Sequence, residues 1–338
     1  MLYTPEMNEA SLEDWVDETL TTALLVQVAG QNVVEINRPI SAAGWIGFDG
    51  ALNIGDAEGG VGLPFKPLPD GRMQHDIASS QKNIISVLVA IAAERGLLSF
   101  HDPISKHLDQ RWSQSTLEEE AAITIWHLLT MTSGLGDDMS YVAPPGTVWR
   151  YNVGPAWHQL KPLLEAASEQ TLQDLTDEWL AEPLGMEESI WIERPGMNYL
   201  NGRPFEALLT SARDLARFGN MILNKGTLAG RQILRTESIT ELLTPSQELN
   251  RAYGLLWWLN GQRPIRLPLE EDPIDSILIP SAPSDTVAAL GALGQFCLIT
   301  PSRQTVVVRL GSALVGDEIG LDITFKIWQF LNQNLFNN

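Results

Sequence analysis

The residues best suited to chemistry lie in the segment DIASSQK, residues 76–82. Ser79 and Lys82 are three positions apart, so on a helical turn their side chains share one face and can reach each other. A serine hydroxyl is a weak nucleophile at neutral pH, and a neutral amine beside it can take its proton. The spacing therefore predicts a serine nucleophile with a lysine base, although Ser-x-x-Lys alone is a common pattern.

The sequence after this segment favours the chemical interpretation. Residues 84–93, IISVLVAIAA, are apolar around most of a helix, so Lys82 in the first turn is expected to be buried. Loss of hydration and the positive end of the helix dipole both oppose a buried cation. The alternative is that Ser79 caps the helix and Lys82 extends to solvent along its alkyl chain. The segment alone leaves both interpretations open.

Six further segments, each of which occurs once, are spread over most of the chain. Together with DIASSQK they resemble successive landmarks of the serine β-lactamases and penicillin-binding-protein-like hydrolases. The likeness is greatest to the class C β-lactamase branch, with its esterases and 6-aminohexanoate-dimer hydrolases. The segments are ERGLLSFHDPISKHL at 94–108, ITIWHLLTMTSGL at 123–135, PPGTVWRYNVG at 144–154, TSARDLARFGNMIL at 210–223, YGLLWW at 253–258 and ALGALGQFCLITPSRQTVVVRLG at 289–311.

The resemblance implies a catalytic set of three side chains. Ser79 would be the acylated nucleophile and Lys82 its base or proton shuttle. Tyr151 matches the tyrosine of the family's Tyr-x-Asn element, and its phenol would pass a proton to the leaving group and return one from the attacking water. The alternative for Tyr151 is an ordinary core aromatic.

The family's Lys/His-x-Gly strand element falls on Ala289, Leu290 and Gly291. This alignment implies that the backbone N–H groups of Ser79 and Ala292 form an oxyanion hole. Two such donors, aimed at the developing negative charge, commonly lower a barrier by a few kcal/mol.

Two departures from the family pattern bear on the substrate. Val153 stands where the family has the asparagine of Tyr-x-Asn, and the neighbouring Asn152 is the remaining candidate for an amide that binds substrate. Ala289 and Leu290 replace the cation and the hydroxyl that bind a substrate carboxylate in β-lactamases and D,D-peptidases. A charge-assisted bond of this kind contributes ~1.5–3 kcal/mol, so its absence argues against a dedicated β-lactamase.

The candidate substrate is therefore a neutral or weakly polar ester or amide, with Trp257 and Trp258 as walls of its pocket. Two other functions stay open: a β-lactamase or D,D-peptidase, and a catalytically silent binding protein that keeps the fold. The intact Ser79, Lys82 and Tyr151 favour a hydrolase over the silent protein.

The elements that must position these residues come from both ends of the chain. We predict an α/β (α+β) fold, β-lactamase/transpeptidase-like, with an antiparallel sheet flanked by helices and an inserted, mostly helical domain. Residues 1–98 and 250–338 would form the sheet domain and 99–249 the helical one, with the active site between them. The expected strands are 23–28, 33–36, 253–259, 286–290, 295–300 and 305–310. The expected helices are 11–20, 80–96, 124–131, 156–168, 172–180, 211–223, 236–243 and 319–331, and residues 44–70 are expected to be irregular.

Composition excludes several classes of function. The 338 residues carry 42 acidic against 22 basic side chains, a net charge of −20, which opposes binding to nucleic acid or anionic lipid. The single cysteine, Cys297, allows no internal disulfide and no multi-cysteine metal site. The histidines are scattered, so neither a metal nor another cofactor is expected. We find no signal-peptide pattern near Met1 and no run of ~20 apolar residues, and we expect a soluble, cytoplasmic protein.

Overall fold

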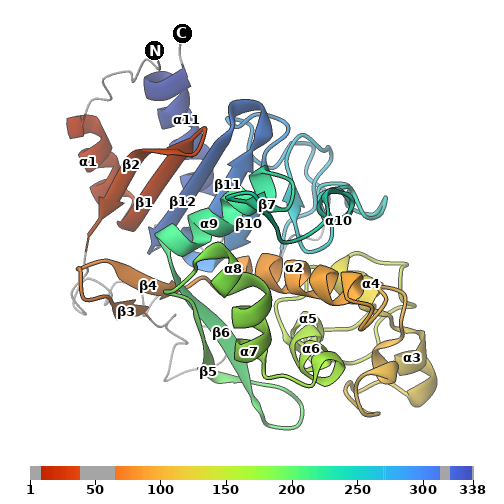
Figure 1. Ribbon diagram of the computed structural model, residues 1–338. Helices are drawn as coiled ribbons and strands as arrows, with labels where there is room; N and C mark the ends of the chain where they lie inside the picture. Colours follow the sequence, from red (N-terminus) through yellow and green to blue (C-terminus); the bar gives the residue numbers. More distant parts are fainter. Residues whose placement is uncertain (1–8, 39–64, 269, 271, 313–319, 337–338) are drawn as a thin grey trace.

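The computed structural model describes residues 9–38, 65–268, 270, 272–312 and 320–336. Its larger sheet has six antiparallel strands in the order β2-β1-β12-β11-β10-β9. Strand β1, from the N-terminal part of the chain, therefore pairs with β12, the last strand in sequence, so that one sheet contains strands from both ends of the chain, as predicted (Figure 1). The strands are β1 (Thr21–Val28), β2 (Gln31–Asn37), β9 (Trp258–Leu259), β10 (Val287–Gly291), β11 (Gln295–Thr300) and β12 (Thr305–Gly311).

Strands β1 and β2, which were both predicted, form an antiparallel hairpin. Ala29 and Gly30 make the connection, with φ of 49° and 77°. Positive φ at both central residues is typical of the tight hairpin turn whose twist matches that of the strands. The second strand therefore begins at Gln31, two residues before the predicted start.

Helices cover both faces of the larger sheet. Figure 1 shows α9 (Ala212–Leu223) in front of the sheet and α11 (Leu321–Leu331) behind it, while α1 (Glu9–Glu18) packs beside β1. Helix α9 approaches closely at Gly219, where an added Cβ would lie 2.7 Å from Val306 and 2.9 Å from Cys297. The absence of a side chain at this position allows the helix to lie against β11 and β12.

A second sheet was not expected. It has four antiparallel strands in the order β3-β4-β6-β5. Its bounds are β3 (Phe65–Pro67), β4 (Met73–Asp76), β5 (Ile190–Asn198) and β6 (Pro204–Ser211). Within the segment 44–70, predicted to be irregular, residues 44–64 lie outside the described residues and 65–67 form β3. Strand β4 leads directly into the candidate nucleophile.

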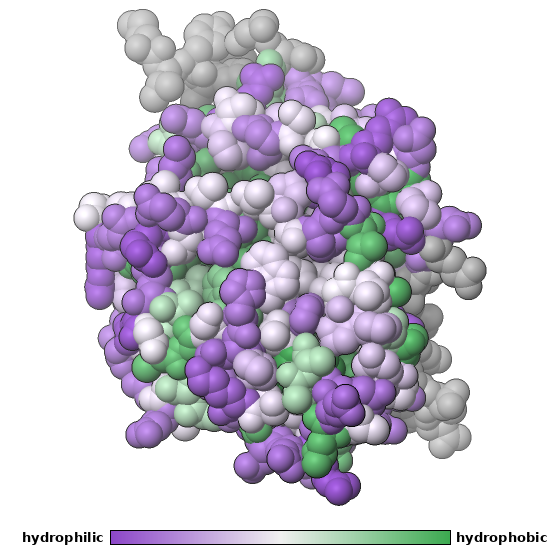
Figure 2. All heavy atoms as spheres, turned by 90° about the vertical axis from the view of Figure 1, so that its right-hand side faces the viewer, coloured by the Kyte–Doolittle hydropathy of each residue, from purple (hydrophilic) through white to green (hydrophobic). Residues whose placement is uncertain are grey.

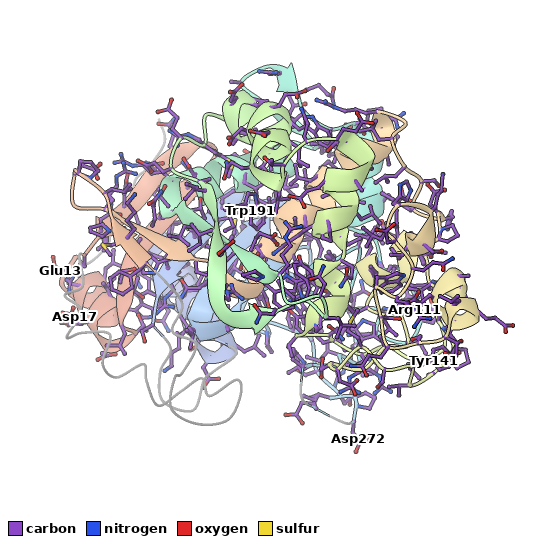
Figure 3. All side chains as sticks on the ribbon, turned by 90° about the horizontal axis from the view of Figure 1, so that it is seen from below. Glu13, Asp17, Arg111, Tyr141, Trp191 and Asp272 are labelled. Carbon is purple, nitrogen blue, oxygen red and sulfur yellow. The ribbon has the colours of Figure 1, made fainter. Side chains whose placement is uncertain are left out.

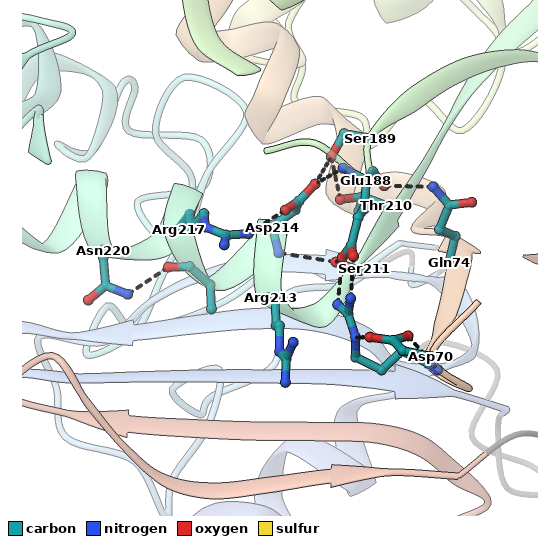
Figure 4. Close-up of polar contacts among 12 residues, drawn as sticks. Asp70, Gln74, Glu188, Ser189, Thr210, Ser211, Arg213, Asp214, Arg217 and Asn220 are labelled. Carbon is teal, nitrogen blue, oxygen red and sulfur yellow. Dashed lines mark hydrogen bonds and ion pairs between the residues drawn. The ribbon is translucent and has the colours of Figure 1, made fainter. Parts of the chain in front are cut away.

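A polar network ties the second sheet to α9 (Figure 4). Arg72, just before β4, donates two hydrogen bonds to the Glu188 carboxylate, and it also pairs with Asp70. The buried Asp214 of α9 accepts from the backbone N–H of Glu188 at 2.7 Å and from Ser189 Oγ at 2.9 Å. These bonds hold the start of β5 against the first turn of α9.

Most of the remaining helices fall within the predicted helical segments, but the helices over 117–122 and 182–184 were not predicted. Helix α2 (Gln81–Glu94) is buried along almost its whole length and packs against β10 and α6. The other elements are α3 (Leu117–Ala122), α4 (Ile125–Leu129), α5 (Pro155–His158), α6 (Leu160–Ser168), α7 (Leu172–Thr176), α8 (Glu182–Leu184) and α10 (Thr236–Leu242), with a short hairpin of β7 (Thr227–Leu228) and β8 (Arg231–Gln232). The strand predicted over 253–259 is wrong for its first five residues, because only β9 pairs in the sheet.

The division at residues 99 and 249 stays a prediction. Helix α9 belongs by sequence to the middle block, yet it packs on β1, β11 and β12 of the larger sheet. On the face shown in Figure 2, hydrophilic and hydrophobic residues are interspersed. Among the helices that the structure describes, none is long and apolar enough to cross a membrane.

Candidate active site

The candidate nucleophile sits on a constrained turn between β4 and α2. Strand β4 ends at Asp76, a 3-10 turn, η2 (Ala78–Ser80), follows, and α2 begins at Gln81. Ala78 has a φ of 48°, in the left-handed region that non-glycine residues seldom adopt. Its N–H donates to Asp76 Oδ1 at 2.8 Å, a local bond that favours such a turn. Contacts of Asp76 and Ala78 therefore fix the shape of the turn that carries Ser79.

Asp76 is itself held by a buried ion pair. Its two carboxylate oxygens accept from Arg194 of β5, Oδ2 from Nε at 2.8 Å and Oδ1 from Nη2 at 2.6 Å. Side-chain exposure is 0% for Asp76 and 8% for Arg194. A buried bidentate pair of this kind is geometrically specific, and removing one partner would leave an uncompensated charge. It anchors the turn to the second sheet.

Ser79 and Lys82 are in direct contact. Lys82 Nζ donates to Ser79 Oγ at 2.9 Å, with Lys82 only 2% exposed and Ser79 half-buried. The cap residue of α2 is Ser80, whose Oγ donates instead to the carbonyl of Gln295 at 2.9 Å. Ser79 therefore does not cap the helix, and Lys82 does not extend to solvent.

The environment of Lys82 disfavours its charged form. Burial lowers the pKa of Lys82 well below the ordinary value for lysine, and the positive charges of Arg194 and Lys161 lower it further. The amine also lies over two aromatic rings, with Nζ 4.7 Å from the ring centre of Tyr151 and 4.4 Å from that of Trp157. A neutral amine at this position can accept a proton from Ser79.

Tyr151 is the second half-buried residue at the site. Burial raises the pKa of Tyr151 to about 12, against a smaller opposing effect of its hydrogen bond with Ser79. Its ring stacks on Trp258, with centres 5.6 Å apart, and meets Tyr253 edge-on at 6.2 Å. The aromatic cluster, which also includes Trp149, therefore fixes the ring while the hydroxyl stays protonated near Ser79.

The end of β10 lies against the nucleophile turn. A Cβ on Gly291 would stand 2.2 Å from the carbonyl oxygen of Ile77 and 3.1 Å from Ser80 Oγ, so the strand can approach only with glycine there. Ala289 and Leu290 precede it, paired with β11 and almost fully buried. Ala292, which follows Gly291, opens the turn η5 (Ala292–Gly294) and is half-buried. The predicted strand element is thus beside Ser79.

Asn152, predicted to bind substrate, has its side-chain amide hydrogen-bonded within the protein. It is 3% exposed, and its side chain donates to the carbonyl of Gly136 at 3.4 Å and accepts from the N–H of Ala156 at 3.3 Å. Both bonds serve the entry into α5. Val153, its neighbour, is 36% exposed. The amide is therefore occupied within the protein.

The two adjacent tryptophans point to different environments. Trp258 stacks on Tyr151 and belongs to the aromatic cluster. Trp257 is fully buried and stacks on Phe218 of α9, with ring centres 6.0 Å apart. Successive residues of an extended segment alternate sides, so only one of the pair can face the site. The prediction of Trp257 as a pocket wall is wrong.

Sequence reasoning missed the polar groups that surround Lys82. His158 of α5, Lys161 of α6 and Arg194 of β5 are all buried next to the site. No local pattern predicts their proximity to Lys82, because it depends on how these helices and the second sheet pack around α2. Within the described part of the chain, no group of three or more His, Cys, Asp or Glu side chains is arranged to hold a metal ion.

Comparison with known proteins places this geometry in context. An uncharacterized protein of Alkalihalophilus pseudofirmus is 27% identical over 260 residues, which cover 70% of this chain and 73% of that protein. Esterase EstB of Burkholderia gladioli is 26% identical over 166 residues, covering 38% of this chain and 42% of the esterase. EstCE1, described as a hydrolase with promiscuous acyltransferase activity, is structurally similar with a TM-score of 0.64 and 13% identity, covering 95% of this chain and 97% of EstCE1.

These similarities confirm the β-lactamase/transpeptidase-like fold expected from the sequence. The beta-lactamase family model matches residues 33–323, a span that includes Ser79, Lys82, Tyr151 and the end of β10. Because this match covers most of the 338 residues, the chain belongs to the beta-lactamase family.

Proposed function

We propose that this protein is a serine hydrolase that cleaves an ester or amide through an acyl-enzyme on Ser79. The observation that carries the proposal is the 2.9 Å hydrogen bond between the buried amine of Lys82 and the half-buried hydroxyl of Ser79. Burial of a lysine against a hydroxyl, with no carboxylate in this contact, lowers the stability of the fold. Such destabilising arrangements are typical of functional sites.

The first half of the reaction forms the acyl-enzyme. The neutral amine of Lys82 takes the hydroxyl proton of Ser79, and Oγ attacks the carbonyl carbon of the substrate. The carbonyl oxygen becomes an oxyanion, which accepts hydrogen bonds from the backbone N–H groups of Ser79 and Ala292. Collapse of the tetrahedral intermediate breaks the bond to the leaving group and leaves the acyl group on Oγ.

Tyr151 supplies the second proton-transfer group. With its pKa raised to about 12, the phenol is protonated at neutral pH and can donate to the departing alkoxide or amine. The phenolate then recovers a proton by way of Lys82. In deacylation the same groups act in reverse order: water gives a proton to Tyr151 while the phenol passes its own proton to the neutral amine of Lys82, and the hydroxide attacks the acyl carbon. Lys82 then returns the proton to Ser79 Oγ as the bond between Oγ and the acyl carbon breaks.

The substrate class follows from what surrounds the nucleophile. Ala289 and Leu290 offer neither a cation nor a hydroxyl to a carboxylate, and Trp258 presents an aromatic surface next to Tyr151. A neutral or weakly polar ester or amide fits this lining better than a penicillin-like carboxylate. The partial likeness to esterase EstB supports the same substrate class.

Two other functions have specific support. A β-lactamase or D,D-peptidase is favoured by the family itself, and a catalytically silent binding protein by the departures at Val153, Ala289 and Leu290. Rapid turnover of a chromogenic cephalosporin would favour the first. Binding without turnover of any ester, amide or β-lactam would favour the second.

The test is hydrolysis of p-nitrophenyl butyrate by the wild type and by Ser79→Ala. We expect turnover by the wild type and a loss on the order of 10³-fold or more in the variant, because removal of a nucleophile leaves only the binding and oxyanion contributions. Ser302→Ala, at an exposed serine far from the turn, is the matched control and should keep wild-type rates. Equal rates for Ser79→Ala and the wild type would refute the proposal.

A further inference from the structure

A second lysine is buried beside the candidate site. Lys161 of α6 is fully buried, and its Nζ contacts three acceptors. These are Gln81 Oε1 at 2.9 Å, His158 Nδ1 at 3.1 Å and the backbone carbonyl of Glu206. An ammonium has three donors and no acceptor, so this environment satisfies its full hydrogen-bonding capacity.

The hydrogen-bond partners of Lys161 are compatible with a retained positive charge. Burial lowers the pKa of His158 well below its usual value, so the ring is neutral and Nδ1 can accept from Lys161. Burial also lowers the pKa of Lys161, while the nearby carboxylates of Glu206 and Asp76 oppose that change. The ionisable groups that face Lys161 from the elements around it are Lys82 of α2, His158 of α5, Asp76 of β4, Arg194 of β5, Glu206 of β6 and Arg203 in the turn between these strands.

Gln81 connects Lys161 to the nucleophile turn. Its Oε1 accepts from Lys161, and its Nε2 donates to the carbonyl of Ala78 at 2.9 Å. Gln81 is itself fully buried. Because Asp76 holds the N–H of Ala78 and Gln81 holds its carbonyl, the strained residue before Ser79 is fixed on both sides.

The same lysine also lies near the proposed base. The indole of Trp157 has Lys82 Nζ at 4.4 Å from its ring centre and Lys161 Nζ at 5.0 Å. The ring centre of a second tryptophan, Trp191, which is labelled in Figure 3, lies 5.0 Å from Lys161 Nζ, and this residue is 9% exposed. The two amines therefore share a desolvated, aromatic environment in which charge interactions are strong.

We propose that Lys161 is a positioning residue for the reaction: through Gln81 it fixes the Ala78 carbonyl, and thereby the turn that presents Ser79 to Lys82. This inference rests on the proposed function and adds a part of the machinery that does not touch the substrate. An apolar side chain could be buried here at a lower free-energy cost than a lysine. The hydrogen bonds to Gln81, His158 and Glu206 give the lysine a role that an apolar side chain could not have.

The first test removes the amine with Lys161→Met. Because displacement of a reacting group by about 1 Å can cost ~100-fold in rate, we expect kcat for p-nitrophenyl butyrate to fall roughly 10- to 100-fold, with KM changed less than about threefold. Loss of the Lys161 charge also raises the pKa of Lys82, so the acid limb of the pH–kcat profile should move to higher pH. A lysine with a merely structural role would lower the stability of the variant without a selective fall in kcat of the folded protein.

The second variant, Gln81→Glu, keeps an acceptor for Lys161 but loses the donor to Ala78. It adds a negative charge beside Lys161 and is therefore expected to fold even if Lys161→Met does not. It should show the same fall in kcat and the same displacement of the acid limb. Ile327→Ala in α11, a core change remote from the turn, controls for stability loss and should leave kcat and the pH profile unchanged.

The outcomes separate the positioning role from the proposed function. Wild-type kcat and an unmoved pH profile in folded Lys161→Met, or in Gln81→Glu if the first variant does not fold, would overturn the positioning role while Ser79→Ala remains inactive. Full activity of Ser79→Ala, or an inactive wild type, would overturn the proposed function and the positioning role with it.

Discussion

At the scale of single residues, the central feature is a buried lysine, with a lowered pKa, next to a serine. Lys82 is buried against the rings of Tyr151 and Trp157. The positive charges of Arg194 and Lys161 lie nearby, and its amine donates a hydrogen bond to the hydroxyl of Ser79. Burial and the two positive charges destabilise the ammonium relative to the amine, whereas the aromatic faces oppose this effect in part. The family-derived role of Lys82 thus has an independent physical basis in its surroundings.

This gives a prediction for the pH dependence of activity. Below the lowered pKa of Lys82 the amine is protonated and cannot act as a base, so kcat/KM should rise with pH and reach its plateau well below the usual lysine pKa. Lys82→Arg, whose guanidinium cannot be deprotonated, should lower kcat/KM by ~10²–10⁴-fold at every pH. The measurement is ester hydrolysis by both proteins from pH 5 to pH 10. Substantial activity in Lys82→Arg would contradict a basic role for this residue.

At the scale of elements, the site is the junction of β4, α2 and β10. The strand end approaches the nucleophile turn at Gly291, and the backbone carbonyl of Ile77 occupies the place where a side chain would stand. Because the obstructing atom belongs to the backbone, it cannot move aside without displacing the turn. The position of the proposed oxyanion donor of Ala292 depends on this contact.

Gly291→Ala should therefore lower kcat/KM by more than its loss of folding stability accounts for. We expect a loss of about 1–3 kcal/mol in the free energy of unfolding from overpacking, and a fall in kcat/KM of ~10²-fold as the donors separate. Gly96→Ala is the control: its φ of 73° makes alanine strained, but nothing lies within 4 Å of the added Cβ. The free energy of unfolding in urea and the rate of ester hydrolysis are measured for both variants. If Gly291→Ala and Gly96→Ala lose the same stability and keep the same activity, the close contact at Gly291 does not position the oxyanion donors.

The sequence predicted the elements with strong periodicity and missed those that depend on tertiary pairing. The apolar runs of β11 and β12 and the helix after Ser79 are long enough to be identified from pattern alone. The hairpin of β5 and β6 was missed, since the choice of strand for these residues depends on pairing with β4, which no local pattern reveals. The contact of Asn152 with Gly136 was not predicted either, because these residues meet only in the folded loop.

At the scale of the whole molecule, a histidine joins the two sheets. His75 of β4 hydrogen-bonds Thr22 of β1 through Nε2 at 2.8 Å, and both residues are buried. Burial, with a smaller contribution from Arg309, lowers the pKa of His75 to about 3. The folded protein therefore keeps this ring neutral at a pH where the unfolded chain would protonate it.

The consequence is a loss of stability in acid. The unfolded histidine binds its proton near pH 6.5 and the folded one only near pH 3, so stability is full above pH 6.5 and falls as the pH drops through this window. At pH 4 the cost is roughly 3 kcal/mol. His75→Asn should reduce the slope of unfolding free energy against pH between 6.5 and 4, measured by urea denaturation. The exposed His101→Asn is the control, and identical slopes for His75→Asn and the wild type would contradict this role.

The most direct test of the account is covalent labelling of the proposed nucleophile. Wild-type protein and Ser79→Ala would be treated with a fluorophosphonate, and the adduct would be measured by intact-mass spectrometry and located by peptide mapping. The account predicts one adduct on the wild type, on the peptide that contains Ser79, and none on the variant. An unlabelled wild type, or an adduct on another serine that persists in Ser79→Ala, would contradict the claim that this turn carries an activated nucleophile.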